Sequence, residues 1–258
     1  MKAFLEKSEK DYLDDFVFIS KYELMNRGID VVDFDGNNPN SLATRNPQPG
    51  DICIGSVDAC IKFFQLVGID ESFYQYIGFP EELKKYYKRK IETIDVLPTV
   101  FTEPFFIKPR YDVKLFTGSV VDSQSRLDFV HKYCKDITEC KHFYKSETIN
   151  IVSEYRCFVS RGMLKGIQWY AGNFEVMLNS KMVKEIKQCI DNYHLANVAY
   201  TLDFAVTDKN EIALIEVNDM WAIGSYGLSA KEYVQMTIDR FNQMYIAKRV
   251  LDKLTKTE

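Results

Sequence analysis

Long apolar runs and clustered histidines are absent from the sequence. None of its apolar runs approaches the ~20 residues that a membrane-spanning helix needs. The N-terminal stretch MKAFLEKSEKDYLDD lacks the apolar segment of a secretion signal. The three histidines are scattered without the spacing of a zinc site. We therefore expect a cytoplasmic protein with no membrane segment and no zinc.

Paired cysteines and a strong charge of one sign are also lacking. None of the six cysteines belongs to a Cys-x-x-Cys pair, and several lie in apolar runs, as in DICIG and YRCFV. Reduced, buried thiols are typical of such positions. The formal net charge is only -4, which argues against a broad nucleic-acid-binding surface. We expect no nucleic-acid partner.

What the chain does contain is typical of a globular protein that begins with an α/β lobe. Hydrophobic residues make up 46% and charged residues 27% of its 258 residues, which is enough for a sizeable core. Aromatic residues, at 14%, are assigned to the core and to interfaces. Predicted strands (14–19, 29–35 and 52–56) alternate with predicted helices (20–28 and 57–68). This alternation predicts a parallel sheet.

The remainder of the chain mixes strands and helices. Residues 80–95 predict an amphipathic helix whose basic residues form a solvated face. Residues 142–172 predict at least three strands, with Gly162 in a hairpin turn. Further helices are predicted at 125–134, 179–195 and 229–254.

The stretch LDFAVTDKNEIALIEVND (202–219) predicts a hairpin that carries acids inside its strands. Asp203 falls roughly opposite Glu216, and Asn218 shares the strand face of Glu216. Two close carboxylates repel each other unless a cation neutralises them, and Mg²⁺ prefers such oxygen ligands. The alternative is an exposed hairpin with ordinary surface acids, but the apolar neighbours of Glu216 favour a metal site.

Basic residues occur in two further motifs. In FFIKPRYDVKLFTGS, Lys108 ends an apolar strand, and Lys114 and Gly118 follow in a loop suited to phosphates. Taken alone, this motif favours an ordinary surface lysine. In SETINIVSEYRCFV, Glu154 and Arg156 share one strand face. Arg156 suits either an ion pair within the sheet or a clamp for an oxyanion, and the residues alone leave both open.

The order of these motifs resembles the ATP-grasp superfamily, in which two lobes grip ATP. In that resemblance, FFIKP corresponds to the nucleotide-contacting strand, KLFTGS to the loop over the phosphates and SETI to the hinge strand at the adenine. The implied nucleotide contacts are Lys108, Lys114, Gly118, Ser119, Glu147, Thr148, Ile149 and Glu154. The implied catalytic residues are Lys114 and Arg156, and the implied Mg²⁺ ligands are Asp203, Glu216 and Asn218.

Two finer elements are most similar to a small ATP-grasp clade of bacteria and phages, named for one arginine and two lysines. They are SEYRCFV and the pattern ND-x-W-x-I-G that begins at Asn218. KLFTGS departs from the usual loop because it has a single glycine. Two points stay open in the sequence: whether Arg89 or Lys90 is the upstream phosphate contact, and whether Asp219 contacts metal, substrate or only a backbone amide.

The resemblance implies an α/β (α+β) ATP-grasp fold. An N-terminal lobe is expected at 1–80 and an ATP-grasp domain at 81–258, divided into a nucleotide-binding lobe at about 81–150 and a metal lobe at about 151–258. The implied activity is an ATP- and Mg²⁺-dependent ligase, with Mn²⁺ as an alternative ion. Such an enzyme joins a carboxylate substrate to an amine acceptor (an amino acid, peptide or protein) through an acyl phosphate. The alternatives are a small-molecule kinase and a catalytically inactive nucleotide-binding or interaction protein.

Overall fold

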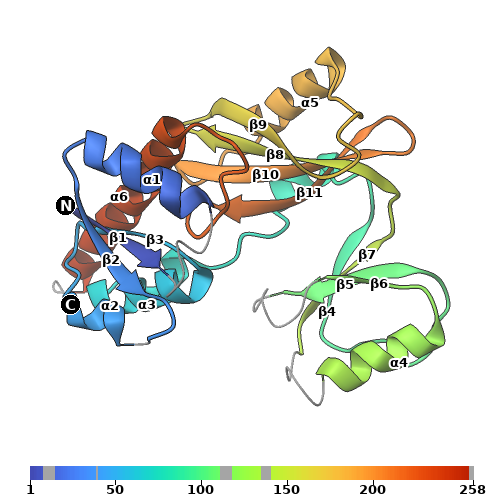
Figure 1. Cartoon of the computed structure of the whole chain (residues 1–258). Helices are drawn as coiled ribbons and strands as arrows, with labels where there is room; N and C mark the ends of the chain where they lie inside the picture. Colours follow the sequence, from blue (N-terminus) through green and yellow to red (C-terminus); the bar gives the residue numbers. More distant parts are fainter. Residues whose placement is uncertain (8–14, 39, 111–117, 135–140, 256–258) are drawn as a thin grey trace.

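The computed structural model describes residues 1–7, 15–38, 40–110, 118–134 and 141–255. Their strands form a parallel sheet and two antiparallel sheets. Figure 1 shows the sheet formed by residues 91–147 set apart from the other two, to which it is joined by extended segments.

The N-terminal lobe contains the parallel sheet, in the order β2-β1-β3. Its elements are β1 (Lys2–Lys7), α1 (Asp15–Asn26), β2 (Asp30–Asp35), α2 (Ser41–Thr44), β3 (Ile52–Ile54) and α3 (Val57–Val67). The predicted parallel α/β lobe is therefore confirmed. Gly28 and Gly68 follow α1 and α3 with φ values of 68° and 69°, the left-handed conformation typical of helix ends.

The prediction of a strand at 14–19 is wrong, because α1 already begins at Asp15. Val17, Ser20 and Leu24 are fully buried, whereas Phe18 and Tyr22 are exposed. This spacing follows a helix rather than a strand. The first strand of the sheet is β1, whose buried stretch is too short to give a recognisable pattern.

The second sheet is antiparallel, in the order β4-β7-β5-β6. Its strands are β4 (Ile91–Ile94), β5 (Phe105–Pro109), β6 (Ser119–Val121) and β7 (Phe143–Glu147), and helix α4 (Gln124–Tyr133) lies beside them (Figure 1). The predicted strand FFIKP and the predicted helix near 125–134 are confirmed.

The prediction of one amphipathic helix at 80–95 is wrong. A short 3-10 helix (Glu81–Tyr86) occupies the first part of this stretch, and β4 occupies the last part. Between them Lys88 has a φ of 55°, which a continuing right-handed helix does not allow. Leu83 and Tyr87 are buried in the core of the third sheet, so tertiary packing overrides the local helical pattern.

The third sheet is antiparallel, in the order β11-β10-β8-β9. Its strands are β8 (Ile151–Ser160), β9 (Met163–Gly172), β10 (Ala199–Thr207) and β11 (Ile212–Asp219), and helix α5 (Ser180–Asp191) packs against them. The predicted strands of 142–172 are confirmed. Arg161 and Gly162 have φ values of 53° and 72°, as a tight two-residue hairpin turn requires.

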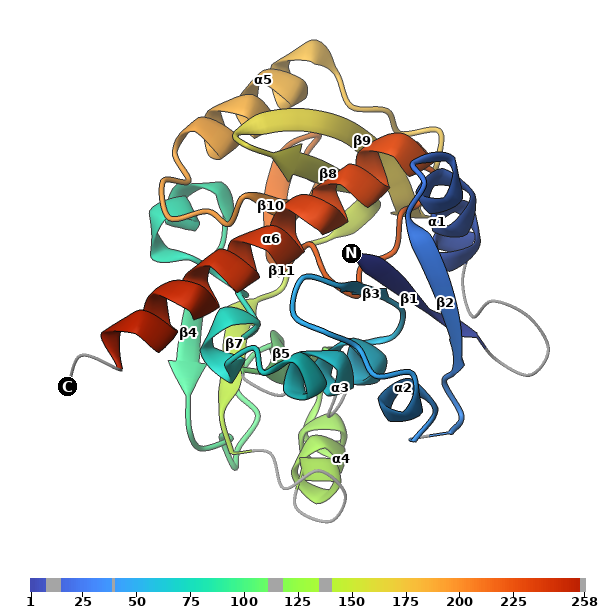
Figure 2. The same cartoon turned by 90° about the vertical axis from the view of Figure 1, so that its left-hand side faces the viewer.

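Helix α6 (Ala230–Leu254), near the C-terminal end of the chain, packs against the N-terminal lobe. Figure 2 shows α6 running across the molecule past α1, β1 and the third sheet. Phe241 of α6 packs in the same buried cluster as Phe4 and Phe63, and the rings of Phe63 and Phe241 lie 5.9 Å apart. The C-terminal helix thus completes the core of the N-terminal lobe. The boundary near residue 80, between the N-terminal lobe and the expected ATP-grasp domain, stays a prediction.

Within the described part of the chain, no helix is both long enough and apolar enough to cross a membrane.

Candidate nucleotide and metal site

The β10–β11 hairpin brings the three predicted metal ligands into contact. Asp203 pairs with Glu216 across the two strands, as the sequence predicted. The Nδ2 of Asn218 donates to Asp203 Oδ2 and to Glu216 Oε1, each at 3.1 Å. A β-bulge between Asp203 and Phe204 interrupts the register at this point.

Arg156 of β8 forms a bidentate ion pair with Asp203. Arg156 lies opposite Asp203 in the sheet, and its Nε and Nη2 donate to the two carboxylate oxygens at 2.8 and 2.7 Å. Burial raises the pKa of Asp203, while Arg156 acts in the opposite direction. Burial would lower the pKa of Arg156, but hydrogen bonding and the charge of Asp203 outweigh it and leave that pKa raised.

Lys108 of β5 reaches from the second sheet to the third. Its Nζ donates to the Glu216 carboxylate and to the Tyr76 hydroxyl, and the Tyr76 hydroxyl donates to Glu216 Oε2 at 2.9 Å. Burial would raise the pKa of Glu216, but the charge and hydrogen bond of Lys108, with bonds from Tyr76 and Asn218, outweigh it and lower that pKa. The predicted nucleotide strand and the predicted metal strand therefore meet.

The two carboxylates are each neutralised by a basic side chain, Asp203 by Arg156 and Glu216 by Lys108. In the described residues no group of three or more His, Cys, Asp or Glu is arranged to hold a metal ion. The oxygen donors of Asp203, Glu216 and Asn218 nevertheless suit a hard cation that also takes phosphate oxygens. The Asn218 amide would have to rotate to present its oxygen instead of its nitrogen.

The predicted hinge residues line a cavity on the second sheet. The cavity measures about 480 Å³, and its lining includes Lys90, Lys145, Glu147, Thr148 and Ile149. Glu147 accepts a hydrogen bond from the backbone N–H of Lys90 at 2.8 Å. The structure thus gathers three predicted adenine contacts in one concave place of a size that suits a ligand.

Arg89 and Lys90, the two candidates for the upstream phosphate contact, have different surroundings. Arg89 donates to the backbone oxygens of Tyr87, Leu214 and Ile215 at 2.9–3.3 Å, and burial lowers its pKa to about 10. Lys90 is solvent-facing and pairs with Glu92 at 3.1 Å. Arg89 therefore braces the predicted metal strand, while Lys90 is an exposed part of the lining of the cavity.

The other predicted residues are placed as follows. Glu154 accepts from the hydroxyl of Tyr170 on β9 at 2.8 Å. Gly118 precedes β6, and a Cβ there would lie 2.2 Å from the ring of Phe106, so a larger residue would require that ring to move. Ser119 begins β6. Lys114 lies outside the described residues.

Asp219 does not belong to the cluster of predicted metal ligands. Its two oxygens accept from Nε and Nη2 of Arg240 on α6, both at 2.6 Å, and Asn197 donates to it at 3.1 Å. Trp221, the tryptophan of the ND-x-W-x-I-G pattern, packs its ring 5.4 Å from that of Phe64 in the core. Both residues anchor the end of β11 rather than contact the site.

Sequence reasoning missed Tyr76 and Tyr226. Tyr76 binds Lys108 and Glu216 from the segment that joins the first two lobes. The ring of Tyr226 lies 4.9 Å from the Arg156 guanidinium. The surplus of aromatic residues was the only signal for either, and it was assigned to the core.

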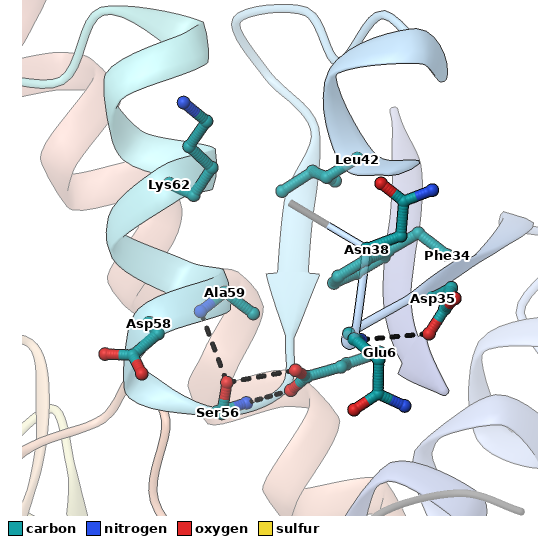
Figure 3. A pocket seen from close by; sticks show the side chains of 11 residues that line it. Glu6, Phe34, Asp35, Asn38, Leu42, Ser56, Asp58, Ala59 and Lys62 are labelled. Atoms are coloured by element: carbon teal, nitrogen blue, oxygen red, sulfur yellow. Dashed lines mark hydrogen bonds between the residues drawn. The ribbon is translucent and has the colours of Figure 1, made fainter. Parts of the chain in front are cut away.

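A separate cavity of about 500 Å³ lies at the carboxyl ends of the N-terminal strands (Figure 3). Phe34, Leu42 and Ala59 form an apolar part of its lining, and charged side chains surround them. The Glu6 carboxylate accepts from the N–H and the hydroxyl of Ser56 at 2.5 and 3.0 Å. Glu6 thereby occupies the N-terminus of α3, where a phosphate would otherwise be favoured.

The chain matches the sequence profile of a known protein family. The sequence profile of the ATP-grasp domain, R2K clade family 2, matches residues 86–236, more than half of the chain. Comparison with curated protein sequences finds no match.

Solved structures share the fold at low sequence identity. D-alanine–D-alanine ligase from Bacillus anthracis, complexed with ATP, superposes with a TM-score of 0.55 at 13% identity, over 98% of this chain and 99% of that one. A RimK domain ATP-grasp protein from Sphaerobacter thermophilus gives 0.57 at 10% identity, over 92% and 99%. N5-carboxyaminoimidazole synthetase from Staphylococcus aureus gives 0.55 at 11% identity, over 92% and 77%. The fold and the family profile together show that the chain belongs to family 2 of the R2K clade of ATP-grasp proteins.

Proposed function

We propose that the protein is an ATP- and Mg²⁺-dependent ligase that joins a carboxylate to an amine through an acyl phosphate. The observation that carries this proposal is the contact of Lys108 with Glu216, next to the Arg156–Asp203 pair. Two sheets thus contribute basic and acidic groups to one place, as transfer of a phosphoryl group between bound substrates requires. Structural neighbours of this fold are mostly ligases, which supports the reaction class at a coarse level.

The chain's own residues have defined tasks in this reaction. A substrate carboxylate oxygen attacks the γ-phosphorus of ATP, and the bond from that phosphorus to the oxygen of ADP breaks. The amine then attacks the acyl carbon, loses a proton and releases phosphate. Lys108 and Arg156 neutralise the charge that spreads over the transferred group. Asp203, Glu216 and Asn218 would hold Mg²⁺, which supplies further neutralisation at the phosphates when bound.

We place the amine acceptor in the N-terminal cavity. Among the described residues, Glu6, Asp35 and Asp58 line it together with one base, Lys62, and this balance disfavours an anion there (Figure 3). Glu6 also fills the helix terminus that could hold a phosphate. An ammonium group with a small apolar body suits the remaining lining. Asp58→Asn is expected to raise the KM for the amine and to leave the KM for ATP unchanged in steady-state assays.

The carboxylate and the amine each stay unidentified in this proposal, and an amino acid, a peptide or a protein all suit it. We also propose that the reaction takes place in the cytoplasm, where ATP is available and the buried thiols of Cys53 and Cys157 would stay reduced.

The proposal is tested by replacing Glu216 with Gln and measuring ADP release across a panel of carboxylates and amines. Glu216→Gln should lower kcat by at least about a hundredfold, because it removes a charge from the predicted phosphate and metal site. Glu211→Gln is the matched control, since Glu211 is exposed in the turn of the same hairpin. Full activity of Glu216→Gln would refute the proposal. A stable phosphoester as the only product would identify a kinase instead.

A further inference from the structure

We propose that Tyr226 is a positioning residue, which holds Arg156 so that its Nη1, which has no acceptor in the described part of the chain, faces the oxyanion of the reaction. The inference deepens the proposed function and rests on it for the role of Arg156. The contacts that suggest it are independent of any substrate.

Arg156 is held on its edge by a carboxylate and lies against two aromatic rings, whose centroids are themselves 5.4 Å apart. Nε and Nη2 are both bound to Asp203, and Nη1 has no acceptor among the described residues. The guanidinium carbon lies 4.9 Å from the ring centroid of Tyr226 and 5.3 Å from that of Tyr170. Such contacts attract a cation to the ring and restrict its tilt. The free donor is therefore fixed in direction.

The backbone at Tyr226 has an unusual conformation. Tyr226 has a φ of 47°, a left-handed conformation that a residue with a side chain rarely adopts. A Cβ at Gly224 would lie 2.9 Å from the Tyr226 ring, and Gly227 follows with a φ of 91°. Strained positions that persist next to a site point to a task there.

The exposure of Tyr226 does not come from a loosely held loop. On one side the hydroxyl of Tyr233 donates to the backbone oxygen of Ile223 at 2.6 Å. On the other side the N–H of Leu228 donates to Ser225 at 2.9 Å, and Leu228 is buried. Tyr226, between these anchors, is 47% exposed. A large ring held in place and half exposed over a buried arginine is not explained by core packing.

The two tyrosines that contact Arg156 have different tasks. The hydroxyl of Tyr170 donates to Glu154, so its ring is fixed by a hydrogen bond. The hydroxyl of Tyr226 makes no hydrogen bond within the described chain, so the ring itself must carry its effect. Tyr226→Phe should therefore preserve the function of the residue, and Tyr226→Leu should remove it.

The first test measures the positioning directly. The rate at which the Arg156 guanidinium rotates about its Nε–Cζ bond is obtained from ¹⁵N NMR of the full chain, with the signal assigned by its loss in Arg156→Lys. Rotation in Tyr226→Leu is expected to be at least about tenfold faster than in the unchanged protein, and in Tyr226→Phe the same as in the unchanged protein. Tyr22→Leu, at a tyrosine 69% exposed on α1, is the matched control. Equal rates in Tyr226→Leu and the unchanged protein would overturn the inference.

The second test measures the consequence for the reaction. ADP release is followed with Mg-ATP and the carboxylate that stimulates it most, or with Mg-ATP alone if none does. Tyr226→Leu is expected to lower kcat about tenfold to a hundredfold, with the KM for ATP changed less than about twofold. Tyr226→Phe and Tyr22→Leu should match the unchanged protein. An unchanged kcat in Tyr226→Leu, or a loss in Tyr226→Phe as large as in Tyr226→Leu, contradicts the assigned role of the ring.

Failure of the inference and failure of the proposed function give different results. If Glu216→Gln abolishes ADP release and Tyr226→Leu does not change it, the proposed function stands and the inference falls. If Glu216→Gln changes nothing, the proposed function falls, and the rotation rates still decide whether Tyr226 holds Arg156.

Discussion

Two buried arginine–aspartate pairs lie on the β10–β11 hairpin and its neighbours, and their geometry is nearly the same. Arg156 binds Asp203 through Nε and Nη2 at 2.8 and 2.7 Å. Arg240 binds Asp219 through the same two nitrogens, each at 2.6 Å. The side chains of both pairs are at most 8% exposed. Burial and bidentate geometry alone do not distinguish a structural pair from a functional one.

The two pairs differ in whether the arginine has a nitrogen without a hydrogen-bond acceptor in the described chain. Arg240 also donates through Nη2 to the backbone oxygen of Phe73 and through Nη1 to Gln243, at 2.6 and 3.2 Å. Nη1 of Arg156 has no acceptor in the described chain, and two aromatic rings lie against the guanidinium. A buried arginine with every nitrogen engaged joins elements to each other, whereas one with a free donor is ready for a ligand.

The largest expected effect is on the structural pair. Arg240→Leu should lower the free energy of unfolding by about 3–5 kcal/mol, because it leaves the Asp219 charge buried without its partner. Urea unfolding followed by circular dichroism measures the loss. Lys248→Leu is the control, because Lys248 pairs with Asp252 on the exposed side of the same helix and should cost less than about 1 kcal/mol. Equal stabilities of Arg240→Leu and Lys248→Leu would mean that the first pair does not hold α6 in place.

Changes in the Arg156–Asp203 pair should affect activity more than stability. Arg156→Lys keeps a positive charge beside Asp203 but loses the planar fork and the free Nη1, so kcat should fall by about 10²- to 10³-fold. Arg240→Lys should leave kcat nearly unchanged and lower stability instead. ADP release and urea unfolding, measured on both variants, test the contrast. The contrast disappears if both variants lose activity in proportion to stability.

An element of the fold could be predicted when the residues that stabilise it are close together in the sequence. The β10–β11 hairpin was predictable because Asp203 and Glu216 are paired through a short turn, which fixes the register. The helix at 80–95 was predicted wrongly because burial of Leu83 and Tyr87 against a distant sheet overrode a local pattern. The strand at 14–19 was predicted wrongly because a short apolar run fits both elements.

In the candidate site too, contacts between residues far apart in the sequence could not be predicted. The residue types at positions 108, 156 and 216 were readable from their motifs and from the family resemblance. The contact of Lys108 with Glu216 was not, because the two residues belong to different sheets and meet only in the folded chain. Tyr76 and Tyr226 resembled core aromatics in the sequence, since no local pattern marks a ring that flanks a cation.

The smallest expected effects come from two asparagines, one bound to each of the two aspartates. Asn197 donates to Asp219 and Asn218 donates to Asp203, and both hydrogen bonds measure 3.1 Å. Asn197→Ala should lower the free energy of unfolding by about 1 kcal/mol, the usual value of one hydrogen bond, and should leave the Mg²⁺ requirement unchanged. Asn218→Ala should cost a similar amount of stability.

Only Asn218→Ala should also change metal binding, because only Asn218 can turn an amide oxygen toward a cation held by Asp203 and Glu216. The Mg²⁺ concentration at which ATP gives half of its thermal shift should rise about tenfold, which corresponds to a lost contact worth about 1.4 kcal/mol. Titrations of both variants at a fixed ATP concentration measure this. If Asn197→Ala and Asn218→Ala require the same Mg²⁺ concentration, the hairpin carries two structural aspartates, and the metal is bound by other residues.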